Sequence, residues 1–197
     1  MDPDDIARSV AAYGETLPWA PPVDGHRCQQ FTADMLRYAE LIRVLRPPWV
    51  LECGTAEGGT ALFLAIKCQA AGAGPVYSID NDPRTPGIRH PQLVLLKGDA
   101  LDPDVIARVT ARAAHLGGRG LVLLDDDHSS GHVLAELDAY GPLADYLICE
   151  DTLMEYLPYA DGPHLALGKW LPQHPEFTPD PEPVPSNHPG GWLRRTG

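Results

Sequence analysis

Four consecutive apolar residues, 121–124, run directly into three aspartates, 125–127, and then into His128. A short apolar run of this kind is typical of a strand that is buried on both faces of a parallel sheet. Open α/β sheets bind their ligands at the carboxyl ends of the strands. The stretch therefore predicts a parallel sheet and places its acids at the edge where chemistry takes place.

The same alternation of strands and helices runs through most of the chain. Apolar runs predict further strands at 49–51, 76–79, 93–96 and 146–149. Helical spacing of apolar residues predicts helices over 32–45, 60–68, 102–114 and about 132–140. Strands that alternate with helices form a mostly parallel sheet with right-handed crossovers.

The end of the chain has a different pattern. Residues 172–189 are rich in proline, which predicts a loop or lid with an edge strand near Phe177. The last eight residues, GGWLRRTG, predict a short antiparallel strand. We therefore expect an α/β fold with a mostly parallel sheet and an antiparallel terminal strand. A length of 197 residues suits one domain, over 31–197, preceded by a leader or lid over 1–30.

Composition narrows the classes of partner. The formal net charge of −12 disfavours nucleic acid, which requires a clustered basic face. Four cysteines without CxxC spacing predict reduced thiols in a cytoplasmic protein. No apolar run approaches the length of a membrane span or a secretion signal, so we expect no membrane partner. The sequence allows a homo-oligomer without indicating one.

The turn after the first predicted strand, GTAEGG, predicts the binding site of an adenosyl ligand. Its glycines, which let the backbone approach a ligand closely, are Gly54, Gly58 and Gly59. A dinucleotide fold favours GxGxxG, and the carboxylate of Glu57 would oppose a phosphate. S-adenosylmethionine lacks a phosphate, and its sulfonium and amino groups favour a carboxylate such as Glu52 or Glu57. The alternative is a plain connection between a strand and a helix.

Acids at the next strand ends extend this interpretation. Asp80 closes the second strand, where a carboxylate can accept hydrogen bonds from both ribose hydroxyls. Asp99 follows the third strand, and Thr55 lies in the turn itself. With Asp125 after the fourth strand, these residues complete the predicted cofactor-binding set.

The opening stretch pairs with Glu150 and Asp151, which follow the fifth predicted strand. Carboxylates from neighbouring strand ends repel one another unless a cation neutralises them, and Mg²⁺ prefers oxygen ligands. We therefore expect Asp125, Glu150 and Asp151 to hold Mg²⁺; the alternative is a set of solvated acids. His128 would stand over the same site and take a proton from a metal-bound hydroxyl, unless it is a helix-cap or surface histidine. Zinc on His128 and His132 is disfavoured because no metalloprotease glutamate lies between them.

Several segments together resemble the cephalosporin hydroxylase-like family of class I S-adenosylmethionine-dependent methyltransferases: LECGTAEGGTALFLA, SIDNDPR, LLKGDALDP, LLDDDHSSGHVLAELDAYGPL, ICEDT and NHPGGWLRR. The resemblance implies a Rossmann-like sheet closed by an antiparallel terminal strand. It also implies metal acids at Asp125, Glu150 and Asp151. The more distant catechol-type O-methyltransferases are similar in having a lysine base three residues after the first metal acid. Here His128 occupies that position, and Asp127 matches an acidic position of the family.

We therefore expect a Mg²⁺-dependent O-methyltransferase that acts on a small hydroxylated molecule, a sugar or aromatic group of a secondary metabolite. Three alternatives are a non-catalytic module that binds an adenosyl ligand, an N-methyltransferase, and a nicotinamide-dependent oxidoreductase. The last is disfavoured by Glu57 in the turn. Four aromatic residues line an acceptor pocket or simply pack: Tyr38, Tyr156, Tyr159 and Trp192.

Overall fold

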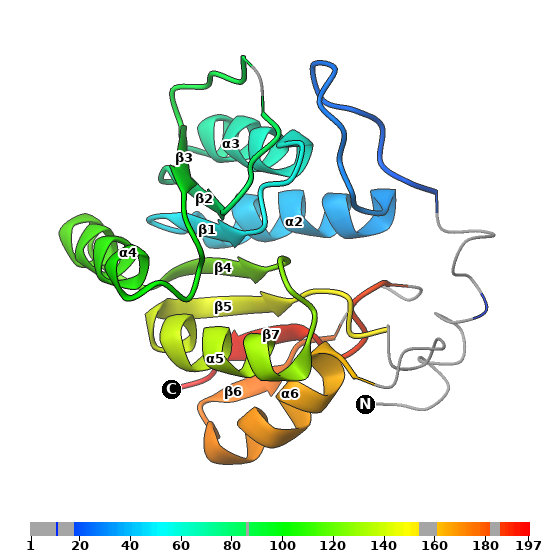
Figure 1. Ribbon diagram of the computed structural model, residues 1–197, viewed down its shortest axis with the longest axis vertical. Helices are drawn as coiled ribbons and strands as arrows, with labels where there is room; N and C mark the ends of the chain where they lie inside the picture. Colours follow the sequence, from blue (N-terminus) through cyan, green and yellow to red (C-terminus); the bar gives the residue numbers. More distant parts are fainter. Residues whose placement is uncertain (1–10, 12–17, 86, 154–160, 182–185) are drawn as a thin grey trace.

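A computed structural model describes residue 11 and residues 18–85, 87–153, 161–181 and 186–197. In this part of the chain one sheet has the strand order β3-β2-β1-β4-β5-β7-β6 (Figure 1). Its strands are β1 (Val50–Cys53), β2 (Val76–Asp80), β3 (Leu93–Lys97), β4 (Gly120–Leu124), β5 (Ala144–Cys149), β6 (Phe177–Pro179) and β7 (Trp192–Arg195). Strands β1 to β5 pair in parallel, whereas β7 is antiparallel to both β5 and β6. The predicted mostly parallel sheet with an antiparallel terminal strand is confirmed.

Helices lie on both faces of this sheet. They are α2 (Thr32–Leu45), α3 (Gly59–Ala71), α4 (Pro103–Leu116), α5 (Ser130–Tyr140) and α6 (Pro163–Trp170), with short 3-10 turns η1 (Gly141–Leu143) and η3 (Leu171–Gln173). One face packs against α2 and α3, and the other packs against α4, α5 and α6. Among the described residues, no helix combines the length and the apolar composition that crossing a bilayer requires.

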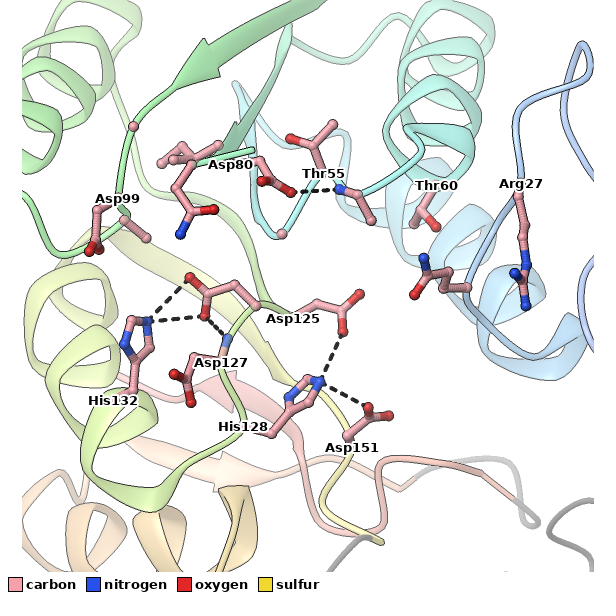
Figure 2. A pocket seen from close by; sticks show the side chains of 18 residues that line it. Arg27, Thr55, Thr60, Asp80, Asp99, Asp125, Asp127, His128, His132 and Asp151 are labelled. Atoms are coloured by element: carbon pink, nitrogen blue, oxygen red, sulfur yellow. Dashed lines mark hydrogen bonds and ion pairs between the residues drawn. The ribbon is translucent and has the colours of Figure 1, made fainter. Parts of the chain in front are cut away.

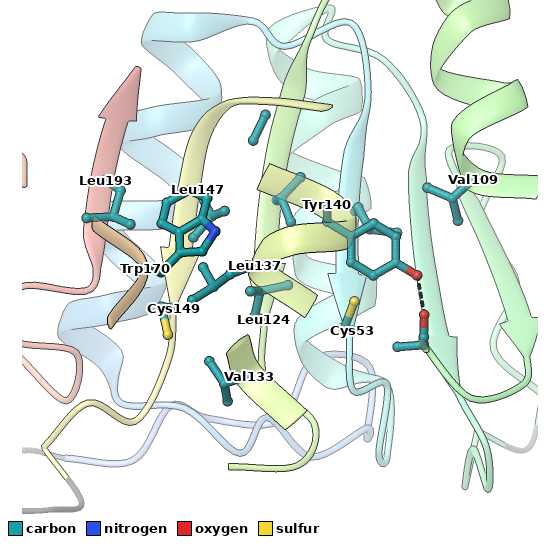
Figure 3. Packing of buried hydrophobic residues seen from close by; sticks show 14 of the residues in the cluster. Cys53, Val109, Leu124, Val133, Leu137, Tyr140, Leu147, Cys149, Trp170 and Leu193 are labelled. Carbon is teal, nitrogen blue, oxygen red and sulfur yellow. Dashed lines mark hydrogen bonds between the residues drawn. The ribbon is translucent and has the colours of Figure 1, made fainter. Parts of the chain in front are cut away.

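The alternating side chains of the strands form two hydrophobic clusters. Leu121 and Leu123 of β4 face the α2 side, whereas Val122 and Leu124 face the α5 side. Figure 3 shows the second cluster, where Trp170 of α6 lies beside β5 and Tyr140 of α5 reaches toward β3. The Tyr140 hydroxyl donates to the Ala100 carbonyl oxygen at 2.5 Å. Because helices cover both faces of the sheet, the central strands consist mostly of consecutive apolar residues.

Most predicted elements are present, with boundaries moved by one to three residues. Helix α2 has the predicted bounds, and Asp102, the first residue of the predicted helix 102–114, is the N-cap of α4, where its side chain accepts from the Asp104 backbone N–H at 2.8 Å. Helix α6 was not predicted, because its eight residues include Gly168 and follow no clear apolar period. Much of the predicted leader at 1–30 lies outside the described residues. Its described part packs on α3, where the Gly59 backbone N–H donates to the Arg27 carbonyl oxygen at 3.1 Å.

The strand order reverses between β1 and β4, so a crevice opens at their carboxyl ends. The backbone is closely packed at this point. A Cβ atom on Gly54 would lie 1.9 Å from the Asp125 carbonyl oxygen, and Gly54 has a φ of +98°. Only glycine fits this position, because any side chain would push β1 and β4 apart.

A second close approach in β4 provides a test of the packing. A Cβ atom on Gly120 would lie 2.4 to 2.6 Å from ring carbons of Trp49, a fully buried side chain. We expect Gly120→Ala to lower the free energy of unfolding by about 1–3 kcal/mol through overpacking. Gly131→Ala is the control, since nothing lies within 4 Å of its added methyl group in α5. It should raise stability by about 0.5–1 kcal/mol, and urea unfolding measures both values. Equal effects would contradict the packing described for β4.

Candidate active site

A cavity of about 410 Å³ opens at the carboxyl ends of β1, β2, β3 and β4 (Figure 2). It lies where the strand order predicted a ligand crevice. Its lining is mostly polar and comes from these strand ends, from the start of α3 and from the segment before α2. The lining residues are Arg27, Gln29, Gly54, Thr55, Ala56, Thr60, Ile79, Asp80, Asn81, Gly98, Asp99, Ala100, Asp125, Asp126, Asp127, His128, His132 and Asp151.

The glycine turn forms one wall of the cavity. Gly54 and Thr55 line it directly, as predicted for cofactor-binding residues. Gly58 and Gly59 do not line it; they allow close packing instead. A Cβ atom on Gly58 would meet the Ile88 side chain at 2.4 Å, and one on Gly59 would meet the Arg27 carbonyl oxygen at 2.4 Å. Glu57 is half-buried and also lies outside the lining.

Asp80 is the last residue of β2, and Asp99 follows β3; both line the cavity. Each oxygen of Asp80 accepts one backbone N–H at 2.7 Å, from Ala56 and from Asp82. These bonds fix the orientation of the carboxylate, and each oxygen keeps further acceptor capacity toward the cavity. Asp99 accepts from the Leu101 backbone N–H at 2.8 Å and is exposed.

Glu52 is buried in β1 and does not line the cavity. The Ser78 hydroxyl donates to Glu52 Oε2, whereas Oε1 has no hydrogen-bond partner in the described part of the chain. Burial, opposed by the Ser78 hydrogen bond and assisted by the charge of Asp80, raises the pKa of Glu52 to about 8. The structure thus places Glu52 beneath the turn and joins it to Thr55 through Ser78, whose hydroxyl is 2.6 Å from the Thr55 hydroxyl.

Asp125, His128 and Asp151 converge at the other end of the cavity (Figure 2). His128 Nε2 lies 3.1 Å from Asp151 Oδ2 and 4.0 Å from Asp125 Oδ1. One potential ligand atom from each of the three residues lies within 4.8 Å of the other two. His128 is about one quarter exposed, so its ring is open to a ligand in the cavity.

Glu150, the third predicted metal acid, is buried behind Asp125. The Gln30 amide joins the two acids: its Nε2 donates to Asp125 Oδ2 at 2.8 Å and also to Glu150 Oε2. Burial, together with the repulsion from Glu150 and Asp151, raises the pKa of Asp125 well above its usual range. Burial and the charge of Asp151 likewise raise the pKa of Glu150. The protein alone therefore does not fully compensate the negative charge that Asp125 and Glu150 carry when ionised.

A hydrogen-bonded chain that the sequence did not reveal orients Glu150 and Asp151. The Asp151 backbone N–H donates to His188 Nδ1 at 2.8 Å, so neutral His188 carries its proton on Nε2. That atom lies 2.9 Å from the Tyr38 hydroxyl, which in turn donates to Glu150 Oε1 at 2.9 Å. Asn187 Nδ2 also donates to Asp151 Oδ1. These contacts hold Asp151 at a φ of +54°, an unusual conformation for a non-glycine residue.

The aromatic residues suggested for an acceptor pocket divide in two. Tyr38 and Trp192 are fully buried, with ring centroids 5.5 Å apart, so the packing alternative holds for them. Tyr156 and Tyr159 lie outside the described residues. Sequence reasoning did not assign Gln30 or His188 to the site, and only their positions in the sequence could have indicated that they contact the acids. Gln30 lies just before α2, and His188 lies in the NHPGG segment.

The reversed strand order, the antiparallel terminal strand, the glycine turn and the acids at the carboxyl edge agree with the predicted class I methyltransferase fold. The comparison with protein families places the chain within that class: the model of the Rhamnosyl O-methyltransferase/CmcI family matches residues 14–196. The chain belongs to this family. The predicted enzyme class, an S-adenosylmethionine-dependent methyltransferase, is confirmed. The family assignment therefore speaks against the alternative of a nicotinamide-dependent oxidoreductase.

Individual relatives agree with this assignment. The rhamnosyl O-methyltransferase of Mycobacterium tuberculosis H37Rv is 31% identical over 176 residues, which cover 83% of this chain and 71% of the relative. The Mycobacterium leprae enzyme of the same name is 29% identical over 161 residues, covering 77% of this chain and 70% of the relative.

Solved structures show the same fold. CmcI with Mg and SAM has a TM-score of 0.69 at 21% identity, covering 95% of this chain and 84% of that one. MycE, a methyltransferase from the mycinamycin biosynthetic pathway solved with Mg, SAH and mycinamycin VI, has a TM-score of 0.54 at 23% identity. That match covers 70% of this chain and 42% of MycE.

The raised pKa of Glu52 predicts a pH dependence of stability. The folded chain keeps a proton on Glu52 up to about pH 8, whereas the unfolded chain releases it near the ordinary value of 4.5. Unfolding therefore becomes more favourable as the pH rises between these values, by at most about 1.4 kcal/mol per pH unit. Glu52→Gln should flatten this dependence, measured as thermal midpoints in EDTA from pH 5 to 8. Glu57→Gln, a half-buried control, should keep the wild-type slope, and equal slopes for Glu52→Gln and wild type would refute the assignment.

Proposed function

We propose that this chain transfers the methyl group of S-adenosylmethionine to a sugar hydroxyl of a small molecule, with Mg²⁺ held by Asp125, Glu150 and Asp151. The observation that carries the proposal is one cavity that joins the glycine turn to Asp125, Asp151 and His128, with Glu150 buried beside Asp125. The names of its relatives support a sugar acceptor, since they are rhamnosyl O-methyltransferases. The MycE complex with mycinamycin VI supports a natural product as the acceptor class.

The methyl donor would occupy the half of the cavity between the glycine turn and Asp99. Asp80 is oriented by its two backbone N–H donors and would accept hydrogen bonds from the ribose hydroxyls. Asp99 would face the adenine end. Among the described lining residues, Arg27 is the only arginine or lysine, and it would pair with the carboxylate of the donor.

The acids at the other end fit Mg²⁺ in their chemistry. Burial and, after it, repulsion between the acids raise the pKa values of Asp125 and Glu150, and a divalent cation would relieve the repulsion. The Gln30 amide, the positive end of a dipole, already bridges these two acids where a cation would neutralise them. Oxygen ligation favours the three carboxylates over His128 as the ligand set. When bound, Mg²⁺ would orient the acceptor hydroxyl and lower its pKa.

His128 is the proposed general base. Its Nε2 faces Asp151 Oδ2 at 3.1 Å, so the carboxylate fixes the ring and the tautomer with a proton on Nε2. Nδ1 then carries the free lone pair and would take the proton of the acceptor hydroxyl. The developing alkoxide would attack the methyl carbon, and the donor would leave as neutral S-adenosylhomocysteine.

Metal removal and two carboxamide variants test the proposal. EDTA or Asp125→Asn should abolish methyl transfer to a rhamnosylated acceptor while leaving S-adenosylhomocysteine binding nearly unchanged, because the metal acids lie apart from the donor half. Asp80→Asn should instead weaken S-adenosylhomocysteine binding by about tenfold, equal to about 1.4 kcal/mol. Calorimetry measures binding, and transfer of a radiolabelled methyl group measures turnover. Transfer that survives chelation would overturn the metal mechanism, and donor binding without turnover in wild type would favour a non-catalytic module.

His128→Gln separates proton transfer from binding. The variant should lower kcat by about 10²–10⁴, the usual contribution of a general base, while the Kd of S-adenosylhomocysteine stays at the wild-type value. His115→Gln on α4 is a matched control, because this histidine is exposed and does not line the cavity. A kcat of His128→Gln within a few-fold of wild type would remove His128 from the mechanism.

A further inference from the structure

A second group of metal-binding side chains lies on the α5 side of the sheet. Asp126 follows β4, and His132 and Glu136 occupy positions i and i+4 of α5. One potential ligand atom from each residue lies within 4.8 Å of the other two. His132 Nε2 is 3.2 Å from the Asp126 carboxylate. The spacing of four residues puts the imidazole and the Glu136 carboxylate on one face of the helix.

This group is separate from the acids proposed to hold Mg²⁺. Asp125 turns toward the α2 side, where its carboxylate accepts from Gln30, whereas Asp126 turns toward His132 on the α5 side. The neighbouring aspartates thus serve different clusters, as successive side chains along an extended chain point to opposite faces. His132 lies apart from the Asp151 and His128 pair in Figure 2.

Glu136 is the unusual member of the group. Its side chain has no exposed surface, and neither carboxylate oxygen makes a hydrogen bond of ordinary geometry among the described residues; its polar neighbours are the Cys53 thiol and the Asp126 carboxylate. It projects from the core face of α5, beside Val133 and Leu137, toward Asp126. An ionised carboxylate buried without a partner costs several kcal/mol. Burial and the charge of Asp126 accordingly raise the pKa of Glu136. A cation among the three side chains would remove this cost.

We propose that Asp126, His132 and Glu136 form a binding site for Zn²⁺. One imidazole nitrogen and two carboxylates favour a transition ion over Mg²⁺, which prefers oxygen alone. Three protein ligands would leave a fourth position open. Asp126 and His132 line the cavity, so that position would face it and the ion could enter from there. Glu136 would close the site on the buried side.

Bound Zn²⁺ would fasten both ends of the loop between β4 and α5. Asp126 is the second residue of this loop and His132 lies in the first turn of α5, and the residues between them include His128. This effect on His128 rests on the proposed function, whereas Zn²⁺ binding itself does not. A failure of the base assignment would therefore leave the binding test unaffected.

Calorimetric titration of the chelator-treated full chain with ZnCl₂, in excess MgCl₂ to occupy the other acids, tests the site. Wild type should bind one equivalent of Zn²⁺. His132→Gln and Glu136→Gln should each weaken Zn²⁺ binding by at least about tenfold. Glu136→Gln is nearly isosteric and removes a buried carboxylate, so folding should be preserved; circular dichroism and S-adenosylhomocysteine binding verify it for both variants.

His128→Gln is the matched control, because Asp125, His128 and Asp151 form the other described group of potential ligands. It should keep the wild-type affinity for Zn²⁺. Loss of Zn²⁺ binding in His128→Gln but not in His132→Gln would move the ion to the other group and overturn the proposal. Absence of Zn²⁺ binding in folded wild type, or unchanged binding in both α5 variants, would overturn it as well.

Discussion

The repulsion between carboxylates gathered at one sheet edge is the constraint on which this structure depends. Parallel strands β1, β4 and β5 end side by side. Asp125, Glu150 and Asp151 therefore meet where they are largely shielded from solvent. Acids in such surroundings must find donors, protons or a cation. The surrounding chain supplies amide and hydroxyl donors from Gln30 and Tyr38, and the proposed Mg²⁺ would neutralise the remaining charge.

These donors come from segments far from the acids in sequence. Gln30 lies before α2, and the Ser186–Asn187–His188 segment lies before β7. The second segment is itself anchored on α2, where the Ser186 hydroxyl donates to the buried Asp34 carboxylate at 2.9 Å. Helix α2 therefore links the two segments through Asp34 and Tyr38. The active-site edge is assembled from the beginning, the middle and the end of the domain.

Prediction from sequence succeeded where a property is local. The strands, their acidic ends and most helices follow from apolar runs and caps, and the positions of Asp80 and Asp125 in the cavity follow from the parallel topology. Prediction from sequence was less informative about the direction in which a side chain points. Glu52, which lies within β1, and Glu150, which follows β5, both turn into the protein interior, because successive residues of an extended chain alternate between faces. Gly58 and Gly59 pack against neighbouring segments instead of lining the cavity.

The sequence by itself determined the class of fold, the edge of the sheet that carries the chemistry and the residue types available there. These follow from periodicity and composition, which act over a few residues. Only the tertiary structure decided which carboxylates face the cavity, that Gln30 bridges Asp125 and Glu150, and that Glu136 is buried beside Asp126. Such contacts join residues that are distant in the chain or lie on opposite faces of one element. Their energies depend on burial, which no local pattern specifies.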